Sequence, residues 1–356
     1  MKQIVIDNIG FSLQRMGGLS VVWGALLSAL KNSGLSYICM EYPWDKTNEV
    51  RQSLINITVE QQSAKYLQVE RYKNPKVKYN KPFIFHSSHY RLCNNKYAIN
   101  ITTVHDFTYE KYRKGLALWV HSWQKFKAIR KADIVVCISE NTKQDVLHYL
   151  PDVDENKIRV IYNGVSTDYK VIDTDKYSNL GEYVIFVGSR QQYKQFDLVV
   201  RALKNTKYKL AIVGGKLNEE EERFVNETLG EKNYIQLGYL SNLELNELYN
   251  QAVCLAYPSA YEGFGIPVLE AQKAGCPVIA YNASSIPEVI GKTPLLMNEL
   301  TISDFHSKLE ILNDKASRDE IIKAGLENAQ RFSWDKMGNE YVALYKELLQ
   351  KAGNYE

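Results

Sequence analysis

The sequence lacks several features that would place it in other classes of protein. Its five cysteines include no CxxC pair, and an odd number scattered through apolar runs is typical of reduced core residues rather than a disulfide scaffold or zinc site. The apolar stretch 19–30 is too short to span a bilayer. The apolar run within residues 1–7 is likewise too short for a secretory leader, so we expect a cytoplasmic protein.

What is present is typical of a soluble globular chain. Apolar residues make up 45% of the sequence and charged residues 24%, a balance with which a folded core forms readily. A length of 356 residues is too great for one ordinary domain and comfortable for two.

The charge is divided unevenly along the chain, although the net charge is only +3. Residues 1–170 hold 24 Lys and Arg against 15 Asp and Glu, whereas residues 171–356 hold 20 against 26. In 65–81 and 111–131 the basic residues alternate with aromatic ones. Three interpretations follow: a solvated face, a surface that docks on anionic lipid headgroups at the inner face of a membrane or on a phosphate-bearing acceptor, or a nucleic-acid site. The last is disfavoured because no recognised binding motif accompanies the charge.

Both halves of the chain open with the same pattern. The strand-like run 4–6 leads through glycines into a helical pattern over 21–30, and the run 184–187 leads through Gly188 into another over 196–203. A buried strand, a glycine turn and an amphipathic helix open a doubly wound α/β unit. Further Val- and Ile-rich runs alternate with helical stretches, which predicts parallel sheets covered on both faces; these runs are 83–86, 101–104, 134–138, 158–162, 209–213, 234–237, 253–257 and 277–281.

The two halves are joined by a polar linker near 163–182. We therefore predict an α/β protein with two Rossmann-like doubly wound domains, 1–168 and 169–356, that face a central cleft. Apolar residues at helical spacing over 334–350 predict a last helix that packs back on the N-terminal domain.

The most informative segment is 257–275, where a strand ends and a glycine-containing loop starts a new helix near Pro267. Gly263 and Gly265 allow backbone N–H groups to approach a ligand, and the helix N-terminus favours negative charge there. Glu262 and Glu270 follow in the loop and the helix, where carboxylates accept bonds from hydroxyl groups. The alternative is that Glu262 only caps the helix and Glu270 is an exposed helix residue.

A second cluster is Arg190 and Lys194, which follow the first strand of the second half at a spacing of four. Both cations can converge on a diphosphate in that turn, with Arg as the bidentate partner. The alternative is a pair of surface cations at a helix start, where positive charge is unfavourable without a ligand.

The EGFGIPVLE segment, with Glu262 and Glu270 separated by seven residues, resembles the E-x7-E motif of the family-four glycosyltransferases. These are retaining enzymes with the two-domain GT-B fold, and the resemblance covers most of the chain. It implies that Glu262 contacts hydroxyls of the donor sugar and that Glu270 holds the ribose. It also implies that backbone N–H groups of Gly263, Phe264 and Gly265 help to hold the sugar and phosphates.

The same resemblance extends to residues outside that segment. It implies that Arg190 and Lys194 stabilise the departing nucleotide diphosphate. Residues 15–18, with Gly17 and Gly18, resemble the glycine-rich loop that lines the cleft. His105, directly after the strand 101–104, would bind the hydroxymethyl group of the sugar, although a lone histidine is more often structural. Tyr239 and Leu240 resemble the segment that contacts the base through its backbone, and we interpret that segment as structural.

Other polar segments have simpler interpretations. Residues 86–91 follow a strand and are a candidate lining for the acceptor side, whereas 139–142 and 284–288 match structural turns of the family. The DxD pairs 152–154 and 173–175 resemble a metal–diphosphate signature but do not lead from a strand into a binding loop. We expect no metal and no cofactor, because Arg190 and Lys194 can carry the charge.

The sequence therefore predicts a metal-independent, retaining glycosyltransferase of the hexosyltransferase type. Its partners would be a nucleotide-diphosphate sugar and a glycan or lipid-linked acceptor, with no nucleic acid, and its work would belong to bacterial surface polysaccharide or lipopolysaccharide synthesis. The alternatives are an inverting transferase or sugar-nucleotide epimerase on the same fold, and a non-catalytic nucleotide-sugar-binding subunit. A nicotinamide dehydrogenase is disfavoured because no GxGxxG follows either opening strand.

Overall fold

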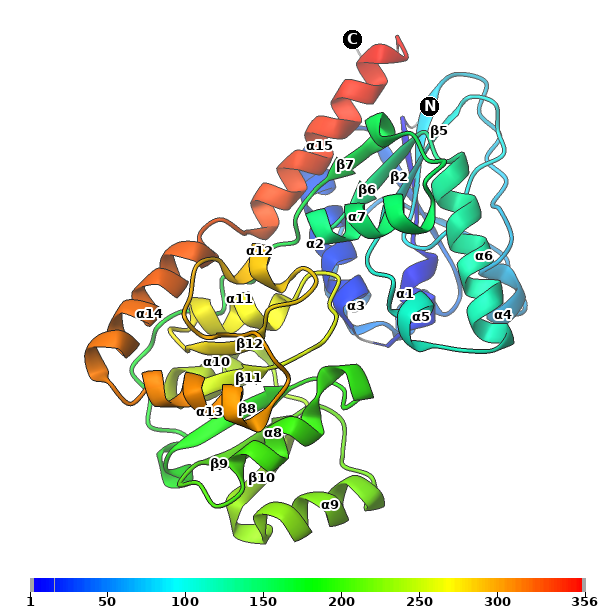
Figure 1. Ribbon diagram of the computed structural model, residues 1–356. Helices are drawn as coiled ribbons and strands as arrows, with labels where there is room; N and C mark the ends of the chain where they lie inside the picture. The colour runs from blue at the N-terminus through cyan, green and yellow to red at the C-terminus, as the bar shows by residue number, and fades with distance from the viewer. Residues whose placement is uncertain (1–2, 16, 354–356) are drawn as a thin grey trace. The chain divides into compact units, whose positions relative to one another are not determined.

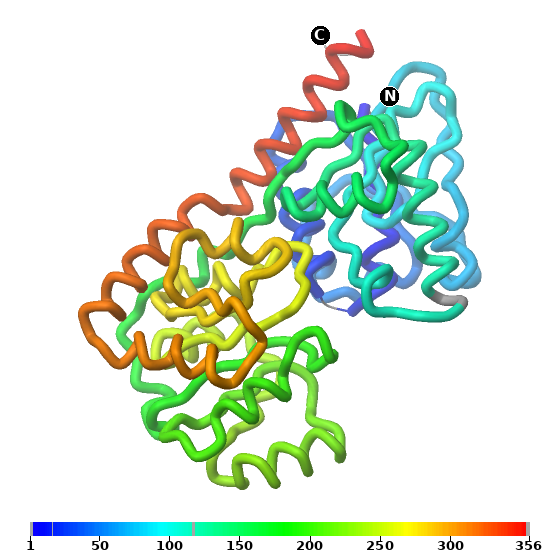
Figure 2. Tube along the Cα trace, in the orientation of Figure 1, coloured from blue at the N-terminus to red at the C-terminus, as the bar shows by residue number. Residues whose placement is uncertain are grey.

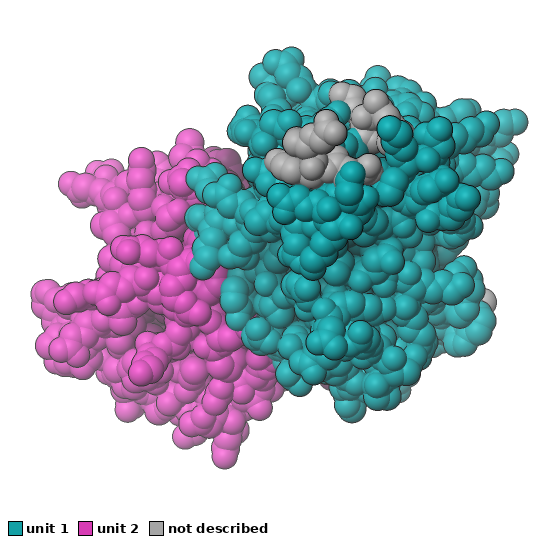
Figure 3. Space-filling view, turned by 90° about the horizontal axis from the view of Figure 1, so that it is seen from above, with its two compact units in different colours: residues 1–164, 333–356 teal, residues 165–332 magenta. Residues whose placement is uncertain are grey.

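The computed structural model describes residues 3–15 and 17–353, with the side chains of 116 and 117 left out. The chain divides into two compact units, coloured separately in Figure 3: residues 1–164 with 333–356, and residues 165–332. The sequence-based boundary at 168/169 falls four residues beyond this division, and the last helix belongs to the first unit. Each unit is an α/β layer structure built on one parallel sheet (Figure 1).

The first unit is built on a seven-stranded sheet in the order β3-β2-β1-β4-β5-β6-β7, and every neighbouring pair is parallel. The central strand β1 is fully buried and consists of apolar residues followed by one carboxylate, as a strand covered on both faces requires. The strands are β1 (Ile4–Asp7), β2 (Tyr37–Glu41), β3 (Val59–Gln61), β4 (Phe83–Ser87), β5 (Ala98–Val104), β6 (Ile134–Cys137) and β7 (Ile158–Val160).

The helices of the first unit, other than the C-terminal α15, lie in the connections between these parallel strands. The longest of them are α2, which starts at the glycine pair, α6, and the C-terminal α15. The helices are α1 (Ile9–Leu13), α2 (Gly18–Asn32), η1 (Asp45–Thr47), α3 (Glu49–Ser53), α4 (Leu67–Glu70), α5 (Thr108–Tyr112), α6 (Leu116–Lys131), α7 (Glu140–Tyr149), η2 (Glu155–Lys157) and α15 (Trp334–Lys351).

Helix α15 completes the first unit, although nearly 170 residues separate it from the rest of that unit along the chain (Figure 2). It packs closely on α2: a Cβ placed on Gly338 would lie only 2.3 Å from the Cβ of Ala29. A second close approach joins the points where the chain leaves and re-enters the unit, since a Cβ on Gly164 would lie 2.2 Å from the backbone nitrogen of Trp334.

The second unit contains a six-stranded parallel sheet in the order β10-β9-β8-β11-β12-β13. Its first strand β8 is again central and apolar, and lies between β9 and β11. The strands are β8 (Tyr183–Val187), β9 (Lys209–Val213), β10 (Tyr234–Gly238), β11 (Cys254–Tyr257), β12 (Val278–Tyr281) and β13 (Leu296–Met297).

Four helices of the second unit, α9, α10, α13 and α14, begin with a polar side-chain cap, such as the capping box in which Asn218 and Glu221 satisfy each other's backbone N–H groups. The helices are η3 (Ser178–Leu180), η4 (Gln192–Lys194), α8 (Phe196–Leu203), α9 (Glu219–Leu229), η5 (Glu231–Asn233), α10 (Asn242–Gln251), α11 (Ile266–Lys273), α12 (Ile286–Ile290), α13 (Ile302–Ile311) and α14 (Lys315–Ala329).

The predicted linker is attached to the second unit rather than free. Backbone N–H groups of Lys170 and Ile172 donate to the side-chain oxygens of Asn246 and Asn250 on α10 at 2.9 and 2.8 Å. This ladder of amide side chains holds an extended segment against a helix without any strand pairing.

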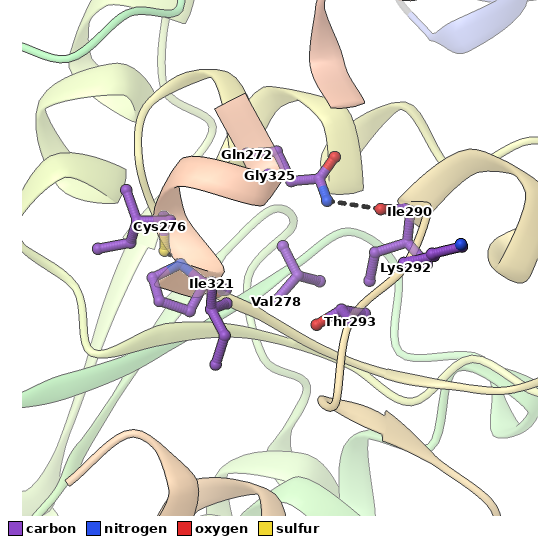
Figure 4. A pocket seen from close by; sticks show the side chains of 10 residues that line it. Gln272, Cys276, Val278, Ile290, Lys292, Thr293, Ile321 and Gly325 are labelled. Carbon is purple, nitrogen blue, oxygen red and sulfur yellow. Dashed lines mark hydrogen bonds between the residues drawn. The ribbon is translucent and has the colours of Figure 1, made fainter. Parts of the chain in front are cut away.

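The second unit also encloses a small cavity beneath α11 and α14, lined by Gln272, Val278 and Ile321 among others (Figure 4). The Gln272 amide donates to the Ile290 carbonyl at 2.8 Å, which closes one side of the cavity. Its volume of about 10 Å³ is close to the minimum that one water molecule needs, so it is a packing defect and not a ligand site.

None of the helices in the described part of the chain combines the length and the apolar character that crossing a bilayer requires. The five cysteines are all buried and free.

Candidate functional site

Two loops of the second unit meet at the carboxyl ends of the neighbouring strands β8 and β11. One loop runs from β8 into α8 and carries Arg190 and Lys194, and the other runs from β11 into α11 and carries Glu262. A backbone hydrogen bond joins them, since the N–H of Ala260 donates to the carbonyl of Tyr193 at 2.7 Å. In open α/β sheets this edge is where ligands bind.

Lys194 and Glu262 form an ion pair between these loops. The two side chains are only 14% and 13% exposed, so the pair is poorly screened by solvent yet remains in reach of a ligand. The ammonium group also lies 5.4 Å from the ring centroids of Tyr193 and Tyr257. Burial first, and then the Glu262 carboxylate, raise the pKa of the Tyr257 phenol well above its ordinary value. The phenol is therefore a neutral hydroxyl beside a carboxylate.

The start of α11 presents backbone N–H groups beside this pair. Gly265 caps the helix at φ +105°, and Pro267 occupies the first turn, where its missing N–H removes no helical bond. A Cβ on Gly265 would lie 2.8 Å from Cδ1 of Ile286, so backbone conformation and space both favour glycine there. The side chain of Phe264 packs against Phe332, with ring centroids 5.7 Å apart, and leaves the backbone as its contribution to the site.

Two serines hold this loop in place. The N–H of Glu262 donates to Oγ of Ser284 at 2.9 Å, and Oγ of Ser285 lies 2.9 Å from each of the carbonyls of Glu262 and Phe264. Ser284 has a φ of +52°, a conformation that L-residues rarely adopt. The turn 284–288, interpreted from sequence as structural, thus braces the loop that carries Glu262.

Glu270 lies on α11 among aromatic residues of two other segments. The nearby phenols of Tyr169 and Tyr249 lower the pKa of its carboxyl group, but burial outweighs them and raises the pKa to about 7. Burial and the Glu270 carboxyl raise the pKa of both phenols in turn, so both remain neutral; the Tyr169 hydroxyl donates to Oδ1 of Asn242 at 3.2 Å. The group is therefore poised between its neutral and ionised forms near neutral pH.

Arg190 contacts the segment that follows β9 and the first turn of α9, rather than the Glu262 loop. Its Nη1 and Nη2 donate to the carbonyls of Gly215 and Lys216 at 2.9 and 2.6 Å, and its Nε lies 3.0 Å from the carboxylate of Glu221 in the first turn of α9. That Arg190 binds a diphosphate stays a prediction. The guanidinium would either keep these contacts while it binds the phosphates or give up some of them.

Tyr239 and Leu240 directly follow β10 in the same unit. The Tyr239 side chain is 84% exposed, which is unusual for an aromatic residue of this size. Its hydroxyl lies 3.5 Å from the position of a Cβ on Gly215, next to the carbonyl that Arg190 contacts.

The remaining site candidates belong to the first unit. His105 follows β5, and burial first, then the nearby Lys125 against the opposing influence of Asp106, lower its pKa to about 4. Its imidazole is therefore neutral at pH 7 and suited to hydrogen bonding rather than to proton donation. Gly17 and Gly18 lie at the N-terminus of α2, while residue 16 of the same segment lies outside the described residues.

The interpretation of residues 86–91 as an acceptor lining is wrong for His86. This residue is fully buried, and its two ring nitrogens bond to the hydroxyls of Tyr345 and Thr103 at 2.7 and 2.9 Å. It is therefore a satisfied core histidine that ties β4 and β5 to α15. Arg91 is also buried, 3.5 Å from the carboxylate of Asp7.

The DxD pairs lie in ordinary surface structure. Asp152 is in an ion pair with Arg130 at 2.7 Å, and Asp154 caps the turn η2. Within the described residues, no three His, Cys, Asp or Glu side chains are grouped closely enough to hold a metal ion.

Two family models match the chain, one on each unit. The model described as Glycosyltransferase Family 4 matches residues 16–169, and the model described as Glycosyl transferases group 1 matches residues 176–328. The second region contains the loops that carry Arg190, Lys194 and Glu262, and the first contains Gly17, Gly18 and His105.

The chain is also similar to characterised proteins. It is 26% identical to the serotype-specific mannosyltransferase WbdA of Escherichia coli over 64% of this chain, and the match spans only 30% of the length of that relative. It is 26% identical to the O-antigen chain mannosyltransferase B of Escherichia coli over 75% of each chain. The solved structure of HepE from Anabaena in complex with UDP and glucose superposes with a TM-score of 0.73 at 15% identity, over 98% of this chain and 100% of that one. The chain thus belongs to the family-four glycosyltransferases and has the GT-B fold of two Rossmann-like domains.

Proposed function

We propose that the protein transfers a sugar from a nucleotide-diphosphate donor to a glycan or lipid-linked acceptor, with retention of configuration and without a metal ion. The observation that carries the proposal is the Lys194–Glu262 ion pair beside the glycine-capped start of α11. One cation and one carboxylate thus lie beside the N-terminus of a helix at the carboxyl ends of the strands, which supports a site for an anionic, hydroxyl-bearing ligand.

Each of these groups matches one part of such a donor. The Lys194 ammonium and the α11 N-terminus suit the diphosphate, and the Glu262 carboxylate suits the sugar hydroxyls. Glu270 would accept bonds from the two ribose hydroxyls, and the exposed Tyr239, which follows β10, is a candidate for contact with the base. The UDP and glucose present in the HepE structure support this class of ligand.

The reaction would break the bond between the anomeric carbon and the diphosphate oxygen. Negative charge develops on the leaving diphosphate, so fixed cations and N–H dipoles aimed at it would be the largest contribution to rate. Lys194, and Arg190 after exchange of its carbonyl contacts, would supply that stabilisation in place of a metal. The acceptor hydroxyl would attack from the face that the nucleotide leaves, and the neutral His105 would hold a sugar hydroxyl.

The acceptor class follows from the relatives. Mannosyltransferases described as serotype-specific and as acting on the O-antigen chain support a role in cytoplasmic assembly of bacterial surface polysaccharide. A mannosyl donor makes GDP the first nucleotide to test, and the HepE complex makes UDP the second.

The test is a thermal-shift screen of the purified protein with UDP, GDP, ADP and TDP in the presence of EDTA. We expect one nucleotide to stabilise the protein, and the corresponding nucleotide sugar then serves for product analysis by NMR. An α-linked product from an α-linked donor supports retention, whereas inversion, epimerised donor or no turnover would favour the rival assignments. Absence of any thermal shift, with or without magnesium, would contradict the donor site.

A further inference from the structure

The first unit carries an aromatic and basic surface on α5 and α6 that the transfer reaction does not use. Trp119 and Trp123 of α6 are 66% and 51% exposed, one helical turn apart, and Tyr109 and Tyr112 of α5 are 40% and 42% exposed. Helices α5 and α6 lie next to each other in Figure 1, and the ring of Tyr109 stacks on that of His121 at 4.2 Å. Soluble surfaces seldom gather large aromatic side chains in this way.

The two faces of α6 differ in exposure. Gln124, Lys125, Ala128 and Ile129 are buried, whereas Trp119, Trp123 and Lys131 are exposed and Lys127 is half-buried. The aromatic residues border a surface hollow of about 420 Å³, and Nζ of Lys127 lies 4.8 Å from the ring centroid of Trp123.

The charged residues of the segment 111–131 are all basic. Residues 111–131 contain seven Lys and Arg and no Asp or Glu. Carboxylates of neighbouring elements neutralise three of the seven: Glu110 pairs with the buried Lys125, Asp145 with Lys111 and Asp152 with Arg130. No ion pair within the described part of the chain involves the other four, which are Arg113, Lys114, Lys127 and Lys131.

We propose that this α5–α6 surface docks the protein on an anionic lipid bilayer, with Trp119 and Trp123 inserted at the headgroup level and the four unpaired cations over the lipid phosphates. Amphipathic tryptophan rings favour the membrane interface, and a helix with aromatic residues beside lysines lies in that interface. Each cation near an anionic membrane strengthens binding about fivefold. The proposal does not depend on the transferase activity.

A second copy of the chain fits this surface poorly. A twofold dimer would place the same patch against itself, so that four cations without ion pairs would meet an equally basic surface. A bilayer that contains anionic lipid supplies the opposite charge and an apolar layer together.

The test compares binding of the full chain to vesicles of pure phosphatidylcholine and to vesicles of equal parts phosphatidylcholine and phosphatidylglycerol. We expect binding to the anionic vesicles only, weakening strongly toward 1 M salt because the screening length falls to about 3 Å. Brominated lipids should quench tryptophan fluorescence on binding.

Variants at the surface separate charge from insertion. The change of Arg113, Lys114, Lys127 and Lys131 to Gln should weaken anionic binding several hundredfold, at about fivefold per cation. Trp119→Ser with Trp123→Ser should abolish most of the quenching and weaken binding. A matched control is Lys204→Gln, Lys232→Gln and Leu243→Ser, which removes exposed cations and an exposed apolar side chain from the second unit and should change nothing.

Each contrary result would overturn the proposal. Equal binding to neutral and anionic vesicles, unchanged binding by the quadruple variant, or no binding at low salt would each do so, as would a concentration-dependent dimer that the tryptophan variant abolishes. Nucleotide-induced thermal shifts of the same samples report on the donor site separately, so failure of docking and failure of the proposed function are distinguishable.

Discussion

The raised pKa of Glu270 makes a quantitative prediction about donor binding. Because burial raises the pKa of this carboxyl to about 7, roughly half of the unliganded molecules carry the proton at pH 7. Ribose hydroxyls donate more strongly to a carboxylate than to a neutral carboxyl group, so binding should bring the pKa of Glu270 back toward its ordinary value. Binding at pH 7 should therefore release about half a proton per site.

The same linkage fixes how affinity depends on pH. The apparent affinity should be constant above about pH 8 and fall about tenfold by pH 6, a loss of roughly 1.4 kcal/mol. The unliganded protein should show the opposite trend. A carboxyl group with a raised pKa contributes stability that is fully present below its unfolded pKa and is lost as the pH rises through about 7.

The assay is isothermal titration calorimetry with GDP-mannose and UDP-glucose in two buffers of different ionisation enthalpy. Nucleotide sugars are suitable because their diphosphate does not titrate in this range. Glu270→Gln is the control, since it keeps the shape but cannot release the proton, and it should bind with an affinity independent of pH. No proton release at pH 7, or an unchanged pH slope in the variant, would refute the assignment of Glu270 to the ribose.

Four further predictions concern the loops and the packing of the units. Lys194→Ala should lower kcat/KM by about 10²- to 10³-fold with unchanged circular dichroism, because the leaving diphosphate loses its cation; normal turnover would remove Lys194 from the site. Ser285→Ala should destabilise the second unit by about 1–3 kcal/mol in urea unfolding, because the two carbonyls that it contacts lose a donor; an unchanged midpoint would show that they need none. Gly265→Ala should lower the melting temperature more than Gly188→Ala, since both have positive φ but only Gly265 also meets a side chain within 3 Å; equal losses would mean that backbone strain alone matters. Gly338→Ala should cost about 1–3 kcal/mol by forcing α15 away from Ala29, and a neutral effect would contradict the close α2–α15 packing.

The central strands of both sheets could be predicted from the sequence, and three outer strands could not. All ten predicted runs are strands, because apolar runs rich in Val and Ile report burial on both faces directly. Strands β2, β3 and β13 were missed. β13 has two residues, β3 is largely polar, and β2 ends in Glu41, whose buried carboxylate pairs with Arg51 and accepts from the amides of Asn8 and Gln61.

In the candidate site, too, residues within one short segment could be predicted from the sequence, whereas partners from distant segments could not. The glycines, glutamates and cations stand in short segments whose spacing can be interpreted directly. The aromatic residues around them come from separate elements: Tyr169 and Tyr249 reach Glu270 from the linker and α10. Nothing local in the sequence indicates that Arg190 turns to the carbonyls of Gly215 and Lys216, because that contact depends on the pairing of β8 with β9.

For His86, the sequence suggested a binding role that the structure does not support. A histidine at the end of a strand is compatible with a ligand site or with the core, and its partners Thr103 and Tyr345 decide between them. Tyr345 lies 259 residues away, on a helix whose return to the first unit is visible only in the fold.

The central claim is that Lys194, Glu262 and the start of α11 form a diphosphate-sugar site, and the most direct test is nucleotide affinity as a function of phosphate number. The dissociation constants of the mono- and diphosphates of the preferred nucleoside are measured by calorimetry in EDTA, for the native protein and for Lys194→Met. The account predicts that the native protein prefers the diphosphate and that the variant loses most of that preference, about 10- to 100-fold, while its affinity for the monophosphate changes little. Equal preference in both proteins would contradict it.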